Sequence, residues 1–264
     1  MTCPSGRKNT LGPNDIQVRY RVTESLDPRT VDSAYAHLSE QELTCSARLQ
    51  FPDDRRDYVV AHDLLRRSLS LYSPVAPNEW EFDSEANGKP LIRDSHFEDG
   101  TRAEFRLSFS LSHARGIVAC AISRYALLGV DVERLDRMAE VEALAESYYS
   151  TDEIAALQSC PQDEQAARFF EQWTLKEAFL KATGAGLSEP LSSVCFEFVG
   201  DDSIIFSPTR SDAQLWHFGL FAPTSHSRLA VAVRRDGGES PRILTRPMEG
   251  NSLIGALRLS TDAA

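Results

Sequence analysis

The chain has 264 residues, of which 42% are hydrophobic and 25% are charged, and its formal net charge at pH 7 is −11. This composition is typical of a globular protein with one large domain or two small ones. The negative charge argues against a general binder of nucleic acid or of membrane surfaces, because both present negative fields that repel such a chain.

The five cysteines are scattered along the chain and form no CxxC pair. The sequence therefore predicts neither a disulfide framework nor a zinc cage, and a reducing compartment is the simplest expectation. The first residues lack the apolar core of a secretory signal, and no apolar run approaches the length of a membrane span. We expect a cytoplasmic protein.

The first half of the chain, residues 14–125, is predicted to contain one long helix between strands. Apolar residues recur at mostly helical intervals between Arg55 and Leu71, with arginines on the solvated side. A tight turn at Asn87–Pro90 follows the helix. In chain order we predict a disordered lead up to residue 13, a strand at 18–22, a helix at 55–71, and strands at 106–111 and 116–122.

The second half, residues 126–235, repeats the order of strand, long helix and antiparallel strands, which suggests a weak internal repeat. We predict a strand at 126–132, helices at 138–149, 152–158 and 164–183, and strands at 194–199, 215–221 and 229–233. The strand at 126–132 is expected to pair as an antiparallel neighbour of the two strands before it. Residues 236–264 are rich in Gly, Ser, Pro and Arg and predict a flexible tail, with a short helix at 253–259.

Two carboxylates stand alone on an otherwise apolar strand. Asp131 and Glu133 are two residues apart, so they share one face of the strand. Like charges held this close repel unless a cation or a proton intervenes. Oxygen ligands without His or Cys favour Mg²⁺ or Mn²⁺. The alternative is a strand end whose acids cap a turn or pair with Arg134 and Arg137.

A third acid lies on the long helix of the second half. Glu177 and Lys181 are four residues apart and therefore side by side on the helix. The alternative is an ordinary surface ion pair. Trp173 lies four residues before Glu177 and indicates that this face of the helix is at least partly covered.

Two further segments fit a phosphate-rich ligand. A strand ends in Ser112 and His113 at a turn, where a hydroxyl and an imidazole can donate to a phosphoryl oxygen. The Asn87–Pro90 turn presents one cation, Lys89. Each segment alone is most simply a capped turn.

In order and in content, these four motifs resemble the Sfp-type 4'-phosphopantetheinyl transferases. They stand here as Asn87–Pro90, Ser110–His113, Gly129–Glu133 and Trp173–Lys181, followed by the Gly184-Ala185-Gly186-Leu187 turn. The resemblance covers about half the chain. It implies an α+β, pseudo-dimeric fold of two similar halves, each with a long helix on a small antiparallel sheet. The first half would carry the ribose and adenine side of coenzyme A, and the second the metal and the catalytic helix.

The resemblance also implies roles for single residues. Glu177, Lys181 and Asp131 would be catalytic, with Glu177 the base for the attacking hydroxyl. Asp131, Glu133 and Glu177 would hold Mg²⁺, with Mn²⁺ an alternative, on the pyrophosphate of coenzyme A. The residues implied for binding coenzyme A are Lys89, Pro90, Ser112, His113, Lys176 and Lys181, with Arg48, Arg55 or Arg56 on the ribose phosphate.

The implied reaction transfers the 4'-phosphopantetheine arm of coenzyme A to a serine of an apo acyl, peptidyl or aryl carrier protein and releases adenosine 3',5'-bisphosphate. This is the holo-[acyl-carrier-protein] synthase activity. We expect a monomer with an internal pseudo-twofold axis. The alternatives are a metal-dependent coenzyme A pyrophosphatase and a non-catalytic coenzyme A or carrier-protein binder. Because Asp131, Glu133 and Glu177 are all present, we rank both below the transferase.

Overall fold

The computed structural model describes residues 10–97, 106–136, 141–186, 189–200, 203–208, 212–235, 239–248 and 256–260. The helices are α1 (Pro28–Ala34), α2 (Glu40–Arg48), α3 (Pro52–Ser70), α4 (Val141–Tyr148), α5 (Thr151–Gln158) and α6 (Gln162–Thr183). The strands are β1 (Asp15–Val22), β2 (Phe82–Ser84), β3 (Pro90–Ile92), β4 (Ser108–Ala114), β5 (Ile117–Ser123), β6 (Leu128–Arg134), β7 (Val194–Val199), β8 (Ser203–Pro208), β9 (Trp216–Phe221), β10 (Ser227–Arg234), β11 (Arg242–Pro247) and β12 (Ala256–Ser260).

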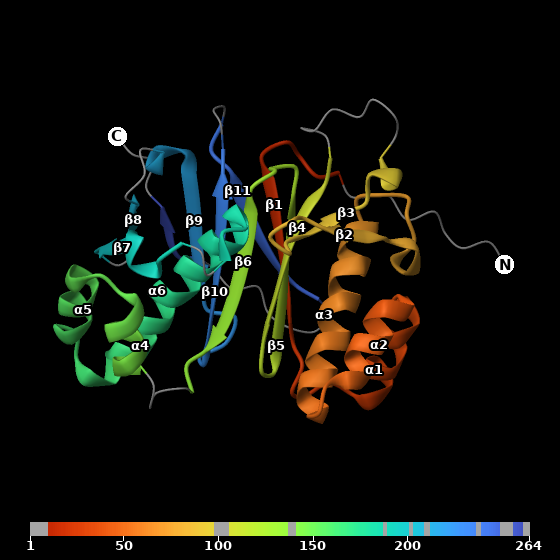
Figure 1. Cartoon of the computed structure of the whole chain (residues 1–264), viewed down its shortest axis with the longest axis horizontal. Helices are drawn as coiled ribbons and strands as arrows, with labels where there is room; N and C mark the ends of the chain where they lie inside the picture. Colours follow the sequence, from red (N-terminus) through yellow and green to blue (C-terminus); the bar gives the residue numbers. More distant parts are fainter. Residues whose placement is uncertain are drawn as a thin grey trace.

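Two sheets form the centre of the molecule, and a long helix covers the outer face of each. One sheet has the order β11-β1-β5-β4 and the other the order β6-β10-β9-β12-β8-β7, beside a small β2-β3 hairpin. Figure 1 shows α3 outside the first sheet and α6 outside the second. Within them, β1-β5-β4 and β6-β10-β9 are equivalent antiparallel sets, each built from the first strand of its half and a later hairpin. The predicted α+β fold of two similar halves is confirmed.

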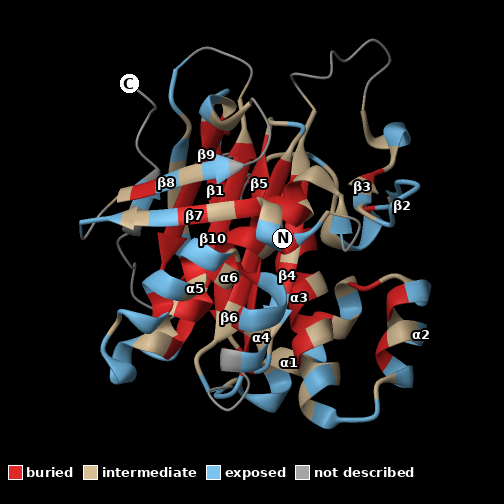
Figure 2. Ribbon diagram, turned by 60° about the vertical axis from the view of Figure 1, so that its left-hand side comes forward, coloured by how far each residue is buried: buried red, intermediate tan, exposed pale blue. Residues whose placement is uncertain are grey.

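The alternation of side chains along the strands produces three hydrophobic layers. On β5, Ile117, Ala119 and Ala121 face the other sheet, whereas Val118 and Ile122 face α3. Figure 2 shows the buried residues concentrated along the central strands and the facing helices. The core between the sheets is therefore shared by both halves, which hold each other in place.

The same alternation directs the acidic face of β6. Leu128, Val130 and Val132 lie in the core between the sheets, so Gly129 and Asp131 face α6. Asp131 is only 4% exposed. The strand thus turns its buried carboxylate towards the helix that carries Glu177 and Lys181.

The predicted antiparallel pairing of β4, β5 and β6 is wrong for β6. β4 pairs with β5, but β6 belongs to the other sheet and pairs with β10. The two sheets nonetheless meet where β4 lies along the free edge of β6. There the hydroxyl oxygens of Ser110 and Ser112 accept hydrogen bonds from the backbone N–H groups of Val130 (2.9 Å) and Val132 (3.3 Å).

The segment predicted as a flexible tail contains two strands. β11 lies parallel to β1 and Met248 is 8% exposed, while β12 replaces the expected short helix and pairs with β9 and β8. The parallel pairs make both sheets mixed. The expected disordered lead differs at its end, because Leu11 is buried in the core beside α3, while residues 1–9 lie outside the described part. The apolar runs in these elements are short and lie among turn-forming residues, so the composition of the segments did not indicate them. Residues 236–238, 249–255 and 261–264 lie outside the described part.

In the described part of the chain, no helix combines the length and the apolar character needed to cross a bilayer.

Truncation after Arg235 is expected to lower the free energy of unfolding by about 3 kcal/mol, because the core loses Met248 and β1 loses its neighbouring strand β11. Urea unfolding of the shortened chain measures the loss. Truncation after Met248 keeps β11 and is the control, with a smaller loss expected. Equal stability of the full chain and the Arg235 truncation would support a loosely docked tail instead.

Candidate functional site

The site depends on an unusually close approach of α6 to β6 at Gly129. A Cβ atom added at Gly129 would lie 1.9 Å from the carbonyl oxygen of Ala178 and 2.6 Å from the nitrogen of Ala182. No residue with a side chain fits there without moving the helix. The glycine therefore lets the catalytic candidates on the helix reach the acid on the strand.

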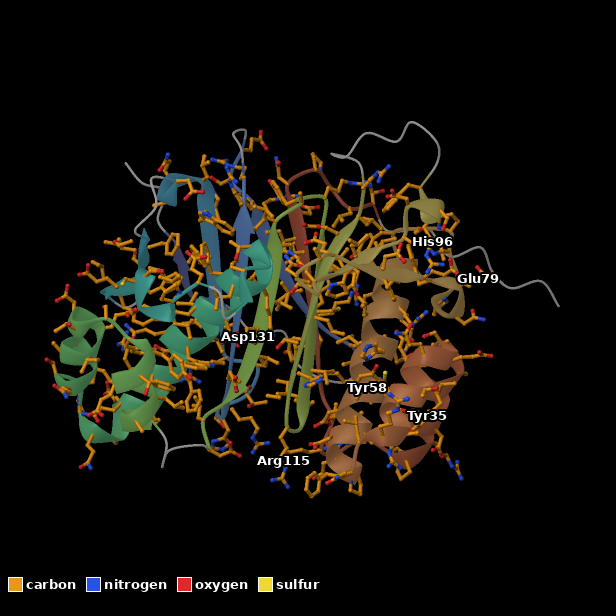
Figure 3. All side chains as sticks on the ribbon, viewed as in Figure 1. Tyr35, Tyr58, Glu79, His96, Arg115 and Asp131 are labelled. Carbon is orange, nitrogen blue, oxygen red and sulfur yellow. The ribbon has the colours of Figure 1, made fainter. Side chains whose placement is uncertain are left out.

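Lys181 joins the three elements that surround the site. Its ammonium group donates to Asp131 Oδ1 on β6 and to Ser112 Oγ on β4, each at 2.7 Å. Asp131 lies near the middle of the molecule, where β6 passes beside α6 (Figure 3). The Lys181–Asp131 pair is only partly buried on the lysine side, so the ammonium group can exchange its partners for those of a ligand.

Ser112 has a structural task in this arrangement. Its hydroxyl donates to Asp131 Oδ1 at 2.9 Å and accepts from Lys181 and from the Val132 N–H group. One donor and two acceptor positions are all that a hydroxyl offers. The predicted contact of Ser112 with a phosphate would require one of these bonds to break, whereas His113, next along the strand, is exposed and accessible.

Glu177 lies close enough to Asp131 for their charges to interact. Burial and the nearby Asp131 carboxylate raise the pKa of Glu177, and the ammonium group of Lys181 offsets part of the rise. Among the residues that the structure describes, none donates a hydrogen bond to the buried Asp131 Oδ2. The negative charge of the two carboxylates is only partly balanced by Lys181, and one buried oxygen accepts no hydrogen bond from the described residues. These features fit the binding of a cation that prefers oxygen ligands.

Glu133 does not form a three-residue metal site with Asp131 and Glu177 in the described structure. Among the residues that the structure describes, no group of three His, Cys, Asp or Glu side chains is placed to hold a metal ion. Glu133 is half-buried beyond Asp131 on the strand and lies opposite Arg228 of β10. Asp131 and Glu177 are thus the two predicted ligands that the structure brings together.

A cavity of about 290 Å³ opens beside Glu177 and Lys181. It joins three of the four sequence motifs, since its walls come from the turn before β3, from β4 and from α6. Phe109, Leu111 and Leu180 make one part apolar. The complete lining is Asn87, Gly88, Lys89, Pro90, Phe109, Ser110, Leu111, Glu177, Leu180, Lys181, Gly184 and Gly186.

Lys89 joins its turn, which belongs to the first half, to β6 and α6 of the second half. Its ammonium group donates to the carbonyl oxygens of Ala182 at 2.7 Å and of Leu128 at 3.3 Å. The first carbonyl belongs to the last turn of α6, where a cation is favoured. Burial lowers the pKa of Lys89, and Glu85 opposes this shift. The lysine predicted to lie beside adenine therefore directs its charge to the backbone, while Pro90 lines the cavity.

The structure places Lys176 away from the cavity, contrary to its predicted role in binding coenzyme A. It is fully buried, and its ammonium group lies 2.8 Å from Glu153 of α5. Burial lowers the pKa of Lys176, and Glu153 opposes this shift. Consecutive helical residues point about 100° apart, so a lysine next to Glu177 cannot share its face.

The three candidate arginines lie outside the cavity lining. Arg48 is exposed in the last turn of α2, and Arg55 donates to the carbonyl oxygen of Leu49 at 2.8 Å. Arg56 pairs with Asp53 and Asp57. Asp57 also accepts from the Gly116 N–H group, so Arg56 lies beside the β4-β5 hairpin, whose tip at Arg115 is seen in Figure 3.

The sequence did not indicate the apolar wall of the cavity or the contact between the end of α6 and the Asn87 turn. Gly184 adopts a left-handed conformation, with φ of 70°, and a Cβ atom there would lie 2.3 Å from Asn87 Nδ2. The sequence indicated this turn through the glycine that follows the helix. It did not indicate the contact with Asn87, because the two residues are far apart along the chain. Phe109 and Leu180 carried no signal beyond ordinary core positions.

Comparison with known proteins gives a consistent result. Residues 127–233 match the family model described as the 4'-phosphopantetheinyl transferase superfamily. The chain is 33% identical over 202 residues to the 4'-phosphopantetheinyl transferase HetI of Nostoc sp., covering 75% of this chain and 79% of that protein. It is 31% identical over 183 residues to psf-1 of Bacillus pumilus, covering 69% and 70%, and 28% identical over 156 residues to Sfp of Bacillus subtilis, covering 59% and 64%. A holo-(acyl-carrier-protein) synthase structure from Bacillus anthracis shows a partial likeness, with 15% identity and a TM-score of 0.37 over 42% of this chain and 98% of that one.

Gly129→Ala is expected to lower the free energy of unfolding by about 3 kcal/mol, because the new methyl group overlaps the backbone of α6. Thermal unfolding measures the change. Gly219→Ala is the matched control on β9, since the three atoms nearest to its added Cβ atom all belong to side chains, the first being Ile243 Cδ1 at 2.7 Å. Equal losses in the two variants would contradict the close approach.

Glu177→Gln is expected to raise the melting temperature at pH 7 in the absence of divalent metal. A carboxylate whose pKa is raised by folding destabilises the native state as the pH rises above its ordinary pKa of 4.5. The gain should vanish at lower pH, where the carboxyl group is protonated in both states. Melting curves from pH 3 to 8, with exposed Glu197→Gln as the control for net charge, test the sign. A variant that is less stable than the wild type at pH 7 would contradict the prediction.

Proposed function

The chain belongs to the 4'-phosphopantetheinyl transferase superfamily, and from this premise we propose that it transfers the 4'-phosphopantetheine arm of coenzyme A to a serine of an apo carrier protein. The observation that supports the proposal is the meeting of Asp131 with Glu177 and Lys181 beside one cavity. Acids that attract a metal ion and a lysine that can donate to a phosphate are the groups that this reaction needs.

Asp131 and Glu177 would hold Mg²⁺ or Mn²⁺, with Glu133 as the third acid of the motif. The orphaned Asp131 Oδ2 and the raised pKa of Glu177 support this assignment. When bound, the ion supplies positive charge that neutralises the pyrophosphate of coenzyme A.

The carrier serine oxygen attacks the phosphorus that bears the pantetheine arm, and the bond to the bridging oxygen of the pyrophosphate breaks. Adenosine 3',5'-bisphosphate leaves with that oxygen. Glu177 accepts the proton of the serine hydroxyl, directly or through water, and its raised pKa makes it a better base than an exposed glutamate. Lys181 moves its hydrogen bonds from Asp131 and Ser112 to the phosphate oxygens where charge develops.

The remaining binding residues divide between the cavity and its surroundings. The apolar wall of Phe109, Leu111 and Leu180, with Pro90, suits a flat base or a pantetheine arm. His113 is exposed at the end of β4 and available to a phosphate. Of the arginines, Arg56 is the one tied to the β4-β5 hairpin, so it is the preferred contact for the ribose phosphate over Arg48 and Arg55.

The carrier protein is recognised by local features, because the net charge of −11 gives no bulk attraction to an acidic partner. We place the reaction in the cytoplasm and assign one chain to each active unit, as the two halves already enclose the site.

Incubation with coenzyme A, Mg²⁺ and a panel of apo acyl, peptidyl and aryl carriers, read by intact mass, tests the function. We expect a phosphopantetheine adduct on at least one carrier, lost in chelator and restored by Mg²⁺ or Mn²⁺. Glu177→Gln should lower turnover by roughly a hundredfold and Lys181→Met by roughly tenfold or more, since each removes a group aimed at the transition state.

Matched melting curves of these variants show whether each remains folded. Release of adenosine bisphosphate and phosphopantetheine without any carrier adduct would identify a pyrophosphatase. Binding of coenzyme A without turnover would identify a non-catalytic binder. Full activity in chelator would overturn the metal assignment.

A further inference from the structure

Each half of the molecule buries one cation from its long helix, and the two cations have matching surroundings. Lys176 of α6 is 0% exposed and Arg66 of α3 is 1% exposed. Each forms an ion pair with a glutamate of the short helix before it. The partner of Lys176 is Glu153 of α5, and the partner of Arg66 is Glu42 of α2.

Lys176 connects three separate segments. Its ammonium group donates to Glu153 Oε2 at 2.8 Å and to the carbonyl oxygens of Leu191 at 2.8 Å and Val194 at 2.6 Å. The other carboxylate oxygen of Glu153 accepts from the Phe196 N–H group at 3.1 Å. One buried pair thus binds α5, α6 and the edge strand β7 together.

Glu153 also completes the N-terminal cap of its own helix. Ser150 and Glu153 form a reciprocal capping box on α5, as Ser39 and Glu42 do on α2. Arg66 donates to the carbonyl oxygens of Pro77 at 3.0 Å and Trp80 at 2.9 Å, as Lys176 does to its two carbonyls. The two networks have the same chemistry but lie on different helices.

We propose that the Lys176–Glu153 pair is a positioning device that fixes the rotation of α6 and so aims Glu177 and Lys181 at Asp131. Lys176 and Glu177 are adjacent, so an anchored lysine sets the direction of the glutamate about 100° away. A rotation of the helix would move Lys181 off Asp131 and Ser112. The kinetic part of this inference rests on the proposed transferase function.

The charged groups of this pair lie outside the cavity that Glu177 and Lys181 line. Neither Lys176 nor Glu153 lines the cavity beside Glu177. Their removal should therefore change the placement of the reacting groups and leave the binding surfaces intact. Kinetically, this is a fall in kcat with little change in KM.

The test uses a double variant, because removal of one partner alone leaves a buried charge uncompensated and endangers folding. Lys176→Met with Glu153→Gln removes both charges, and glutamine still supports a capping box. The matched control is Arg66→Met with Glu42→Gln, which removes the equivalent pair from α3 and α2. Both proteins are assayed with Mg²⁺, coenzyme A and an apo carrier well below their melting temperatures.

We expect similar melting temperatures for the two double variants. Turnover should fall by roughly tenfold or more in the Lys176/Glu153 variant alone, because small misplacements of reacting groups have large kinetic effects. Its KM values for coenzyme A and carrier should change by less than about threefold. Unchanged kcat, or an equal fall in the control, would show that the pair serves stability alone and would overturn the proposal.

Amide hydrogen exchange gives an answer that needs no turnover. If α6 rotates, Ser112 loses its hydrogen bond from Lys181 and its hydroxyl group is held less firmly. The Val132 N–H group, which donates to this hydroxyl, should then exchange faster in the Lys176/Glu153 variant and not in the control. Equal exchange in both would contradict the positioning role. A wild-type protein that modifies no carrier would overturn the proposed function separately, while this measurement still decides the role of the pair.

Discussion

The absence of a side chain at Gly129 is the constraint on which the rest of the site depends. The backbone of α6 lies where a Cβ atom would otherwise be, so the helix and the strand meet at backbone distance. Only at this separation can Lys181 reach Asp131 and can the Glu177 and Asp131 carboxylates influence each other. The glycine and the aspartate of one short strand thus act together, one providing the space and the other the charge.

A second constraint comes from the free edges of the two sheets. The N–H groups at the edge of β6 would be left unpaired next to β4, since the two strands form no ladder. Ser110 and Ser112 satisfy them with hydroxyl oxygens. Because Ser112 also bonds to Asp131, the contact that joins the halves and the contact that orients the acid share one side chain.

The sequence was sufficient for the elements with strong periodicity, and it indicated two acids, Asp131 and Glu177, whose charges interact in the structure. The long helices and the strands β4, β5 and β6 fall within a few residues of the prediction, because their apolar patterns are continuous. The pairing of β6 was wrong, since adjacency along the chain does not reveal which sheet a strand joins. Lys176 was misplaced for a related reason. A motif gives residue types at a spacing, whereas the direction of each side chain depends on the rotation of the helix against its neighbours. The strands after residue 236 were missed because a polar, glycine-rich composition can still contain short pairing segments.

The correspondence between the halves does not extend to the candidate site. β1 and β6 are equivalent first strands, and both place alternate residues in the shared core. Where β6 has Gly129 and Asp131 facing its helix, β1 has Gln17 and Arg19, and the residue after the buried cation is Arg67 on α3 instead of Glu177 on α6. The first half therefore has neither the space for a close helix nor the acids for a cation. A scaffold with twofold character therefore carries the close helix approach and the paired acids in only one of its two described halves.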